Sequence, residues 1–254
     1  PGITSINYTG EFTTRMKPNY RDFNIMNSQE QMNVYKEMQQ KGWLNFSSLM
    51  RASNSGVYGK MYQMMTQYDE TNGMFGLANT PEARNAYLRE AEFRNTDWFD
   101  ELFNTNVMQN HAISVSSGTE KTQFYGSLSA FIDPGWTPQS KVNRYTANIN
   151  VTHKILPNLS INMISNTSYR KQKAPGTLSQ DVDPVYGLVK RDFDINPYSY
   201  AMNTSRALSV DEFYTRQYAP FNILHELENN NMEINNIDMR NQISLDWNVI
   251  PELK

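Results

Sequence analysis

The chain has 254 residues, a net charge of −3 and no cysteine, which excludes a disulfide framework and a thiolate metal site. Its Lys and Arg residues are scattered, so there is no basic patch of the kind that binds nucleic acid. A mean hydropathy of −0.67, without any apolar run of the ~18–20 residues that a spanning helix needs, excludes a helical membrane protein. A transmembrane β-barrel remains open, because only alternate residues of its strands must be apolar.

Six segments alternate apolar and polar residues with the period of two that is typical of β-strands. They cover residues 3–14, 107–117, 121–132, 142–154, 159–171 and 234–249. Most of them reach the ~9–11 residues of a tilted transmembrane strand, whereas strands of soluble domains average ~5–6 residues. Alternation alone leaves open whether the apolar face meets a protein core or lipid.

The connections between these segments alternate in length. Short turns follow residues 117, 154 and 249, and the larger connections are residues 15–106, 133–141 and 174–231. Short turns at one end and long loops at the other are typical of outer-membrane barrels. Ordinary globular domains rarely carry two very long loops on the same end of one sheet, so the pattern favours a barrel.

The long connections contain helix signals. Ser28 with Gln31 matches a capping box, and Thr80 before Pro81 matches an N-cap followed by proline at the first helical position. We therefore predict helices that start near Ser28, cover residues 55–67, run from Pro81 to about Phe93, and cover a short stretch near 209–216. The long connections are thus predicted to be folded loops.

Aromatic residues fall near the predicted strand ends. Phe124 and Trp247 lie toward the short-turn end and Tyr145 toward the long-loop end, as expected for the aromatic belts at membrane interfaces. His111 lies on the same parity as the apolar residues of its strand, near the long-loop interface. These positions favour lipid as the phase that the apolar face meets.

Catalytic and metal-binding signals are weak. The three histidines, His111, His153 and His225, are far apart and predict no zinc site. Acidic pairs are best interpreted as solvated loop residues, with a calcium ion in an extracellular loop left open. They are Asp69/Glu70, Asp181/Asp183 and Asp192/Asp194. No nucleophile elbow, phosphate loop or dinucleotide fingerprint is present, so we predict no catalytic residue, no cofactor and no enzyme activity.

The loop aromatics are the candidate ligand-binding residues, because the C–H faces of sugar rings pack on aromatic rings. The alternative is that each ring packs within its own loop or meets a partner protein. The candidates for contact with substrate or with a lid protein are Trp43, Tyr58, Tyr62, Trp136, Tyr186, Tyr198, Tyr200, Tyr214 and Tyr218. Trp98 is expected to be structural.

Four sequence elements occur in a fixed order: Asn95–Trp98, His111–Ser116, Gly118–Lys121 and Tyr125–Leu128. Together they resemble the early barrel region of the SusC/RagA family of TonB-dependent outer-membrane transporters. The resemblance is specific over residues 95–155 and extends over about 3–170. It implies an all-β fold, in which residues 1–254 are the N-terminal portion of a transmembrane antiparallel barrel, about six of ~22 strands, without the plug domain.

The same resemblance implies a function. Members of this family import oligosaccharides or peptides across the bacterial outer membrane, with energy from TonB that is received through N-terminal parts absent from this sequence. The expected partners are outer-membrane lipid and a SusD-like surface lipoprotein that acts as a lid over the long, partly helical extracellular loops. Pairs of transporter and lipoprotein are expected to dimerise.

Two alternatives remain from other classes. One is a soluble all-β module, such as a glycan-binding domain, whose apolar faces pack together. The other is a fragment of a secreted glycoside hydrolase, which the weak carboxylate pattern disfavours. A barrel requires detergent for extraction and a soluble module does not, while hydrolysis of a glycan panel would test the hydrolase interpretation.

Overall fold

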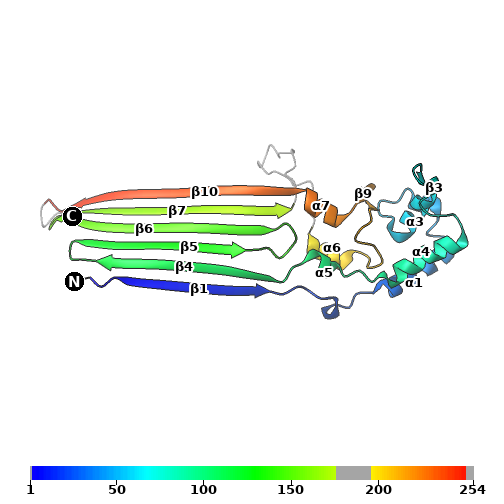
Figure 1. The fold of residues 1–254 in the computed structure, drawn as a ribbon, viewed down its shortest axis with the longest axis horizontal. Coiled ribbons are helices and arrows are strands. Elements are labelled where there is room, and N and C mark those ends of the chain that lie inside the picture. Colours follow the sequence, from blue (N-terminus) through cyan, green and yellow to red (C-terminus); the bar gives the residue numbers. More distant parts are fainter. Residues whose placement is uncertain (1, 176–195, 250–254) are drawn as a thin grey trace. The chain divides into compact units, whose positions relative to one another are not determined.

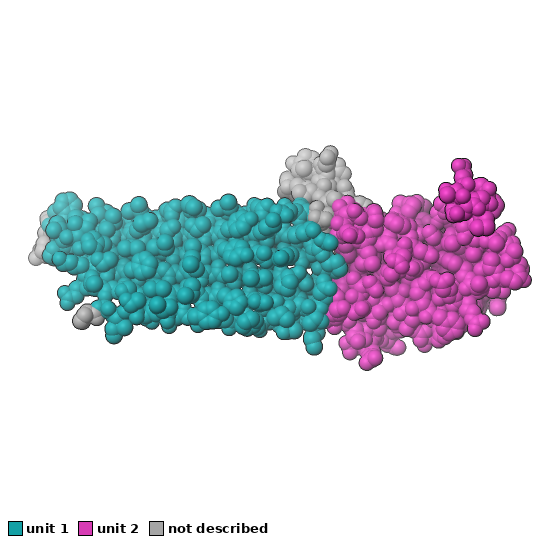
Figure 2. All heavy atoms as spheres, in the orientation of Figure 1, with its two compact units in different colours: residues 1–16, 104–175, 231–254 teal, residues 17–103, 176–230 magenta. Residues whose placement is uncertain are grey.

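The computed structural model describes residues 2–175 and 196–249. The chain divides into two compact units, coloured separately in Figure 2. Unit 1 consists of residues 1–16, 104–175 and 231–254, and unit 2 consists of residues 17–103 and 176–230.

Unit 1 is a single antiparallel sheet whose strand order is β1-β4-β5-β6-β7-β10 (Figure 1). Its strands are β1 (Ser5–Arg15), β4 (Asn106–Gly118), β5 (Thr122–Asp133), β6 (Lys141–Leu156), β7 (Leu159–Pro175) and β10 (Asn231–Trp247). All six predicted strands are confirmed, with ends that differ by up to four residues. The sheet is not closed among the described residues, since β1 pairs only with β4 and β10 pairs only with β7.

The two ends of the sheet differ as the sequence predicts. At one end β4 turns directly into β5, where the Thr119 hydroxyl accepts hydrogen bonds from the backbone N–H groups of Lys121 and Thr122. At the other end Arg15 pairs with Asn106, so the long insertion between β1 and β4 leaves the sheet there. The insertion between β7 and β10 leaves at that same end.

Unit 2 is mainly helical. Its helices are α1 (Ser28–Gln40), α2 (Phe46–Leu49), α3 (Gly56–Thr66), α4 (Pro81–Arg94), α5 (Trp98–Leu102), α6 (Pro197–Asn203) and α7 (Ile223–Asn229), with a 3₁₀ turn at Tyr20–Asp22. Two short hairpins pair β2 (Tyr68–Asp69) with β3 (Met74–Phe75) and β8 (Tyr214–Arg216) with β9 (Ala219–Phe221). No described helix combines the length and apolar character that a membrane span requires.

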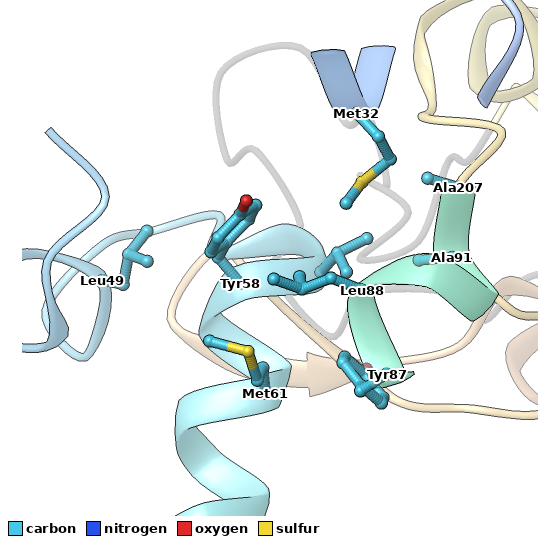
Figure 3. Close-up of a cluster of buried hydrophobic side chains, with 9 residues drawn as sticks. Met32, Leu49, Tyr58, Met61, Tyr87, Leu88, Ala91 and Ala207 are labelled. Carbon is cyan, nitrogen blue, oxygen red and sulfur yellow. The ribbon is translucent and has the colours of Figure 1, made fainter. Parts of the chain in front are cut away.

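All buried apolar side chains of the described residues lie in unit 2. One cluster joins α1, α3 and α4 and is shown in Figure 3. It contains Met32, Leu49, Val57, Tyr58, Met61, Tyr87, Leu88, Ala91 and Ala207. Because Ala207 belongs to the second long insertion and the others to the first, the two insertions share one core.

The Asn95–Trp98 element connects these two insertions. Asn95 ends α4 in the left-handed conformation (φ 49°), and the Asp97 side chain caps α5 by accepting from the N–H groups of Phe99 and Asp100. The Thr96 hydroxyl donates to the Leu208 carbonyl, and Trp98 Nε1 donates to the Ser205 carbonyl. Trp98 is 2% exposed, so the prediction that it is structural is confirmed.

The predicted helices at 55–67 and 81–93 and the helix start near Ser28 are confirmed, but the predicted capping box is wrong. The capping box is formed by Asn27 and Glu30, not by Ser28 and Gln31. The Ser28 hydroxyl instead donates to the Glu92 carbonyl and accepts from the Asn95 N–H.

The predicted helix near 209–216 is also wrong. This stretch bends and then forms β8. Asn222 Nδ2 donates hydrogen bonds to the backbone carbonyls of Val210 and Glu212. In a helix these carbonyls would instead accept from backbone N–H groups four residues later.

Candidate functional site

The sheet of unit 1 has one apolar face. Strand register places on it the alternate residues of every strand. The large apolar residues among them define what we call the apolar face: Ile6, Tyr8, Phe12, Val107, Ile113, Val115, Phe124, Leu128, Ile132, Tyr145, Ile149, Val151, Leu159, Ile161, Met163, Tyr169, Ile237, Met239, Ile243, Leu245 and Trp247. Many of them are strongly exposed, for example Leu128 at 60% and Ile243 at 69%.

No described residue covers this face to form a core. The buried apolar side chains all belong to unit 2, whereas unit 1 leaves even central positions such as Ile149 exposed. Each large aliphatic side chain left in water forgoes roughly 1.5–3 kcal/mol relative to full burial. We therefore expect an apolar face of this size to be in contact with an apolar phase.

Aromatic rings border the apolar face near the loop end. Tyr8 Oη and His111 Nδ1 are hydrogen-bonded at 2.7 Å, and the Phe12 ring meets the His111 ring edge-on at 5.5 Å between centroids. Tyr145 and Tyr169 are register partners whose rings stack at 6.5 Å. Near the turn end the face carries Phe124 and Trp247. The predicted placement of Phe124, Tyr145 and Trp247 is thus confirmed.

Charged residues begin on this face immediately beyond the loop-side aromatic row. Lys171 follows Tyr169 on the same side of β7 and forms an ion pair with Glu233 at 2.8 Å. The ten steps from residue 159 to residue 169 cover ~33 Å along the strand. At a strand tilt of ~40° this gives a band about 25 Å tall, the height of the apolar band of membrane barrels.

The opposite face of the sheet is mainly polar. Its side chains hydrogen-bond one another across the strands: Asn110 Nδ2 donates to Glu11 Oε2, and the Thr152 hydroxyl donates to Asn162 Oδ1. Register also places Arg144 opposite Arg170 on this face. Most of these polar groups are exposed to solvent or bonded to one another, as in the lumen of a barrel, whereas Asn106 Oδ1 is buried without a partner among the described residues.

Unit 2 contains a cavity of about 730 Å³ between α6, β8 and β9. It falls within the usual ~300–1,000 Å³ range of small-molecule sites. Tyr200, Tyr214 and Phe221 supply its aromatic wall, and its charged lining residues are Arg216 and Glu226. The remaining lining is mostly Asn, Ser and Thr. We call this cavity the Arg216 pocket.

Arg216 is held in this pocket by aromatic rings. Its guanidinium carbon lies 4.7 Å from the Phe221 ring centroid and 5.1 Å from that of Tyr200. Arg216 Nη1 is buried and has no hydrogen-bond partner in the part of the chain that the structure describes. Burial raises the pKa of Tyr200, with the nearby Arg216 acting in the opposite direction. The tyrosine therefore stays neutral at physiological pH.

Two of the predicted aromatic candidates, Tyr200 and Tyr214, meet in the Arg216 pocket. Tyr198 lies beside it in sequence but packs against Phe99 and Phe103, with 37% of its surface exposed. The pocket thus brings together two candidates that are separated in the sequence, Tyr200 and Tyr214.

The other candidates do not converge there. Tyr58 is buried in the core at 2% exposure, and the Tyr62 hydroxyl donates to the Leu44 carbonyl. Trp43 and Tyr218 are exposed, at 61% and 78%. Trp136 belongs to unit 1, where its Nε1 donates to the Met16 carbonyl. Tyr186 lies outside the described residues. Contact of any candidate with substrate stays a prediction.

No group of three or more His, Asp or Glu side chains is arranged to hold a metal ion among the described residues. The Asp69 carboxylate accepts from the Thr71 and Asn72 N–H groups and from the Asn72 side chain, and these hydrogen bonds lower its pKa. Asp69 therefore organises its own turn. The acidic pairs of residues 181–194 lie outside the described residues.

The buried tyrosines of unit 2 predict a loss of stability at alkaline pH. Burial raises the pKa of Tyr87 and of Tyr214 well above 10, and the Glu212 carboxylate raises both further. The pKa of each tyrosine is higher in the folded than in the unfolded state, so keeping these tyrosines protonated favours the folded state. This contribution to the free energy of unfolding is complete below the unfolded pKa of about 10 and is lost as pH rises above it. Proteolysis of unit 2 should therefore accelerate from about pH 10, and Tyr87→Phe should flatten the profile. Equal pH profiles for Tyr87→Phe and the parent would contradict this.

No family model and no curated protein matches the chain. Part of its fold is similar to two solved structures of a peptide transporter. One is described as the RagAB peptide transporter, with 15% identity, a TM-score of 0.42 and coverage of 68% of this chain and 18% of that chain. Another is the RagAB peptide importer in the closed-closed state, with 15% identity, a TM-score of 0.42 and coverage of 71% and 19%. The chain thus spans about a fifth of their length. Identity and TM-score at this level leave function to be argued from the chain's own residues.

Sequence reasoning missed Arg216 and Phe221. Both lie in the short aromatic-rich run from Tyr214 to Phe221, where a single arginine is flanked by three aromatic residues. An arginine among aromatics is a signal for cation–π packing. It does not by itself predict that a cavity forms beside that arginine.

Proposed function

We propose that unit 1 is a sector of the wall of an outer-membrane β-barrel transporter and that unit 2 is formed by its loops on the extracellular side. The observation that carries the proposal is the two-faced sheet. Its apolar face is uncovered among the described residues, is bordered by aromatic rings and gives way to charged side chains beyond Tyr169. A soluble all-β module would need a second layer to cover that face, and the described residues supply none.

The edges of the sheet support the same proposal. β10 is an edge strand of 17 residues, and β1 is an edge strand of 11 residues. Soluble proteins keep exposed edge strands short or covered, because unpaired edges promote aggregation. Pairing of both edges with further strands of a closed barrel would satisfy their backbone groups.

The finer parts of the proposal follow the motif resemblance at residues 95–155. We propose TonB-dependent import of oligosaccharides or peptides by a SusC-like barrel of ~22 strands with a SusD-like lipoprotein as partner. The polar face would line the lumen, and the loops of unit 2 would meet substrate and lipoprotein. No covalent chemistry is part of this function.

Paired cysteine variants test the membrane proposal. Leu128→Cys and Ser127→Cys are neighbours on β5 whose side chains lie on opposite faces, and the parent sequence has no cysteine to interfere. After spin labelling of the native polypeptide in its membrane, the label at position 128 should collide readily with oxygen and poorly with a water-soluble nickel complex. Oxygen partitions into lipid and the nickel complex does not, so this result would place the apolar face in lipid.

The second label provides the control. A label at position 127 should show less oxygen contact than a label at position 128 in the same preparation. High access of the nickel complex to both positions, with the polypeptide recovered in the soluble fraction without detergent, would overturn the membrane assignment.

A further inference from the structure

We propose that the Arg216 pocket binds a carboxylate group of the transported ligand. The inference deepens the proposed function and rests on it, because it names the ligand chemistry that the loops of unit 2 recognise. The cavity of about 730 Å³ is large enough for a ligand of small-molecule size. Every lining residue belongs to unit 2.

The guanidinium of Arg216 has no anionic partner among the described residues. No ion pair of the described residues involves Arg216, and its buried Nη1 has no hydrogen-bond partner. Burying a charged N–H donor without an acceptor costs free energy, and this donor lies beside a cavity. We infer that a ligand in the cavity supplies the missing acceptor. The contacts with the Tyr200 and Phe221 rings hold the guanidinium but use none of its N–H donors.

Glu226 also lines the pocket but is occupied elsewhere. One of its carboxylate oxygens accepts from Asn230 Nδ2, and the other lies 3.8 Å from His225 Nδ1. Glu226 therefore leaves Arg216 unpaired, and its negative charge disfavours a doubly charged ligand group such as phosphate. A singly charged, planar carboxylate matches the fork of the guanidinium donors best.

The rest of the lining indicates what the carboxylate is attached to. Tyr200, Tyr214 and Phe221 offer aromatic surface, and Asn203, Thr204 and Gln217 offer neutral hydrogen-bonding groups. Such a mixture suits either a uronic acid of an oligosaccharide or the C-terminal residue of a peptide. The shared chemistry is one carboxylate joined to a ring or side chain of moderate polarity.

Binding of matched probes to the purified native polypeptide in detergent tests the inference. The probes are a tripeptide with a free C-terminus, its C-terminal amide, a hexuronate trisaccharide and the corresponding neutral hexose trisaccharide. At least one carboxylate probe should bind on the order of 10- to 100-fold more tightly than its neutral counterpart in titration calorimetry, as a charge-assisted hydrogen bond predicts. The pair that shows the difference identifies the source of the carboxylate.

Variants assign the effect to the pocket. Arg216→Gln should remove the preference for the carboxylate, and Arg216→Lys should keep part of it. Arg89→Gln is the matched control, because Arg89 lies on the exposed surface of α4 and its guanidinium also contacts a ring, that of Phe93 at 5.9 Å. This control should retain the full preference.

Two results would overturn the inference. One is equal binding of the carboxylate and neutral probes by the parent polypeptide, which needs no variant and so does not depend on variant folding. The other is an unchanged preference in Arg216→Gln. If the spin labels at 127 and 128 still report opposite environments, the barrel proposal stands and only the ligand inference fails.

Discussion

Replacing Ile149 by arginine should abolish assembly of the barrel, whereas replacing Asn150 by arginine should leave it largely intact. Ile149 lies on the apolar face in the middle of β6, which is paired with β5 and β7, and is 43% exposed. Arginine on a lipid-facing strand near the bilayer midplane costs about 2–4 kcal/mol. Asn150 is the next residue and points to the polar face, where a charged side chain stays hydrated.

Heat-modifiable mobility on denaturing gels measures the outcome, together with recovery from the outer-membrane fraction. We expect the folded band to vanish for Ile149→Arg and to persist for Asn150→Arg. If the apolar face met water instead, Ile149→Arg would leave folding unchanged and improve solubility. Loss of the folded band in both variants would mean that position 150 is also packed, which contradicts a hydrated lumen there.

The sheet could be predicted from sequence because its determinants are local. Period-two alternation fixes which side chains share a face, and short turns fix which strands are neighbours. The turn that begins at Gly118 needs only the Thr119 hydroxyl and the backbone near it. The predicted aromatic positions then follow from register alone. The six strands and the two faces of the sheet could therefore be predicted from the sequence.

The helices of unit 2 depend on distant partners, and there the sequence was a poorer guide. Asn27 and Ser28 are both good N-cap residues, and the choice between them is made by Glu92 and Asn95, which occupy the Ser28 hydroxyl. The N-terminus of α6 did have a local signal, since Asn196 before Pro197 repeats the pattern of Thr80 before Pro81. That signal was missed.

The Arg216 pocket lay beyond sequence reasoning for a different reason. Its wall combines residues near Asn54 with residues from α6 to α7, which are distant in the chain. Residue type predicted that loop aromatics are candidates for ligand contact. It did not predict that Tyr58 is buried without an exposed ring face whereas Tyr200 lines a cavity. No periodic pattern predicts which aromatic rings end in a core and which in a pocket.

Replacing Phe99 by alanine should unfold unit 2. The Phe99 side chain is 0% exposed and its ring contacts those of Tyr20, Phe23, Phe103 and Tyr198, with centroid distances from 4.6 to 5.9 Å. Truncation of a buried phenylalanine costs about 3–5 kcal/mol, which is a large part of the stability of a small folded unit. Limited proteolysis of the membrane-inserted polypeptide should therefore cut within residues 17–103 and 196–230 far faster than in the parent.

Phe93→Ala is the matched control, because Phe93 is 60% exposed and its loss should change proteolysis little. The folded band of the barrel should survive in both variants, since every buried apolar side chain of the described residues belongs to unit 2. The proposed barrel would be stabilised by contact with lipid and not by that core. Deleting residues 174–231 would be a less clean test of the loops, because Ala207 would leave the core that it shares with side chains of residues 17–103. Unchanged proteolysis in Phe99→Ala would contradict a unit stabilised by its own core, and loss of the folded band would mean that the sheet depends on that core.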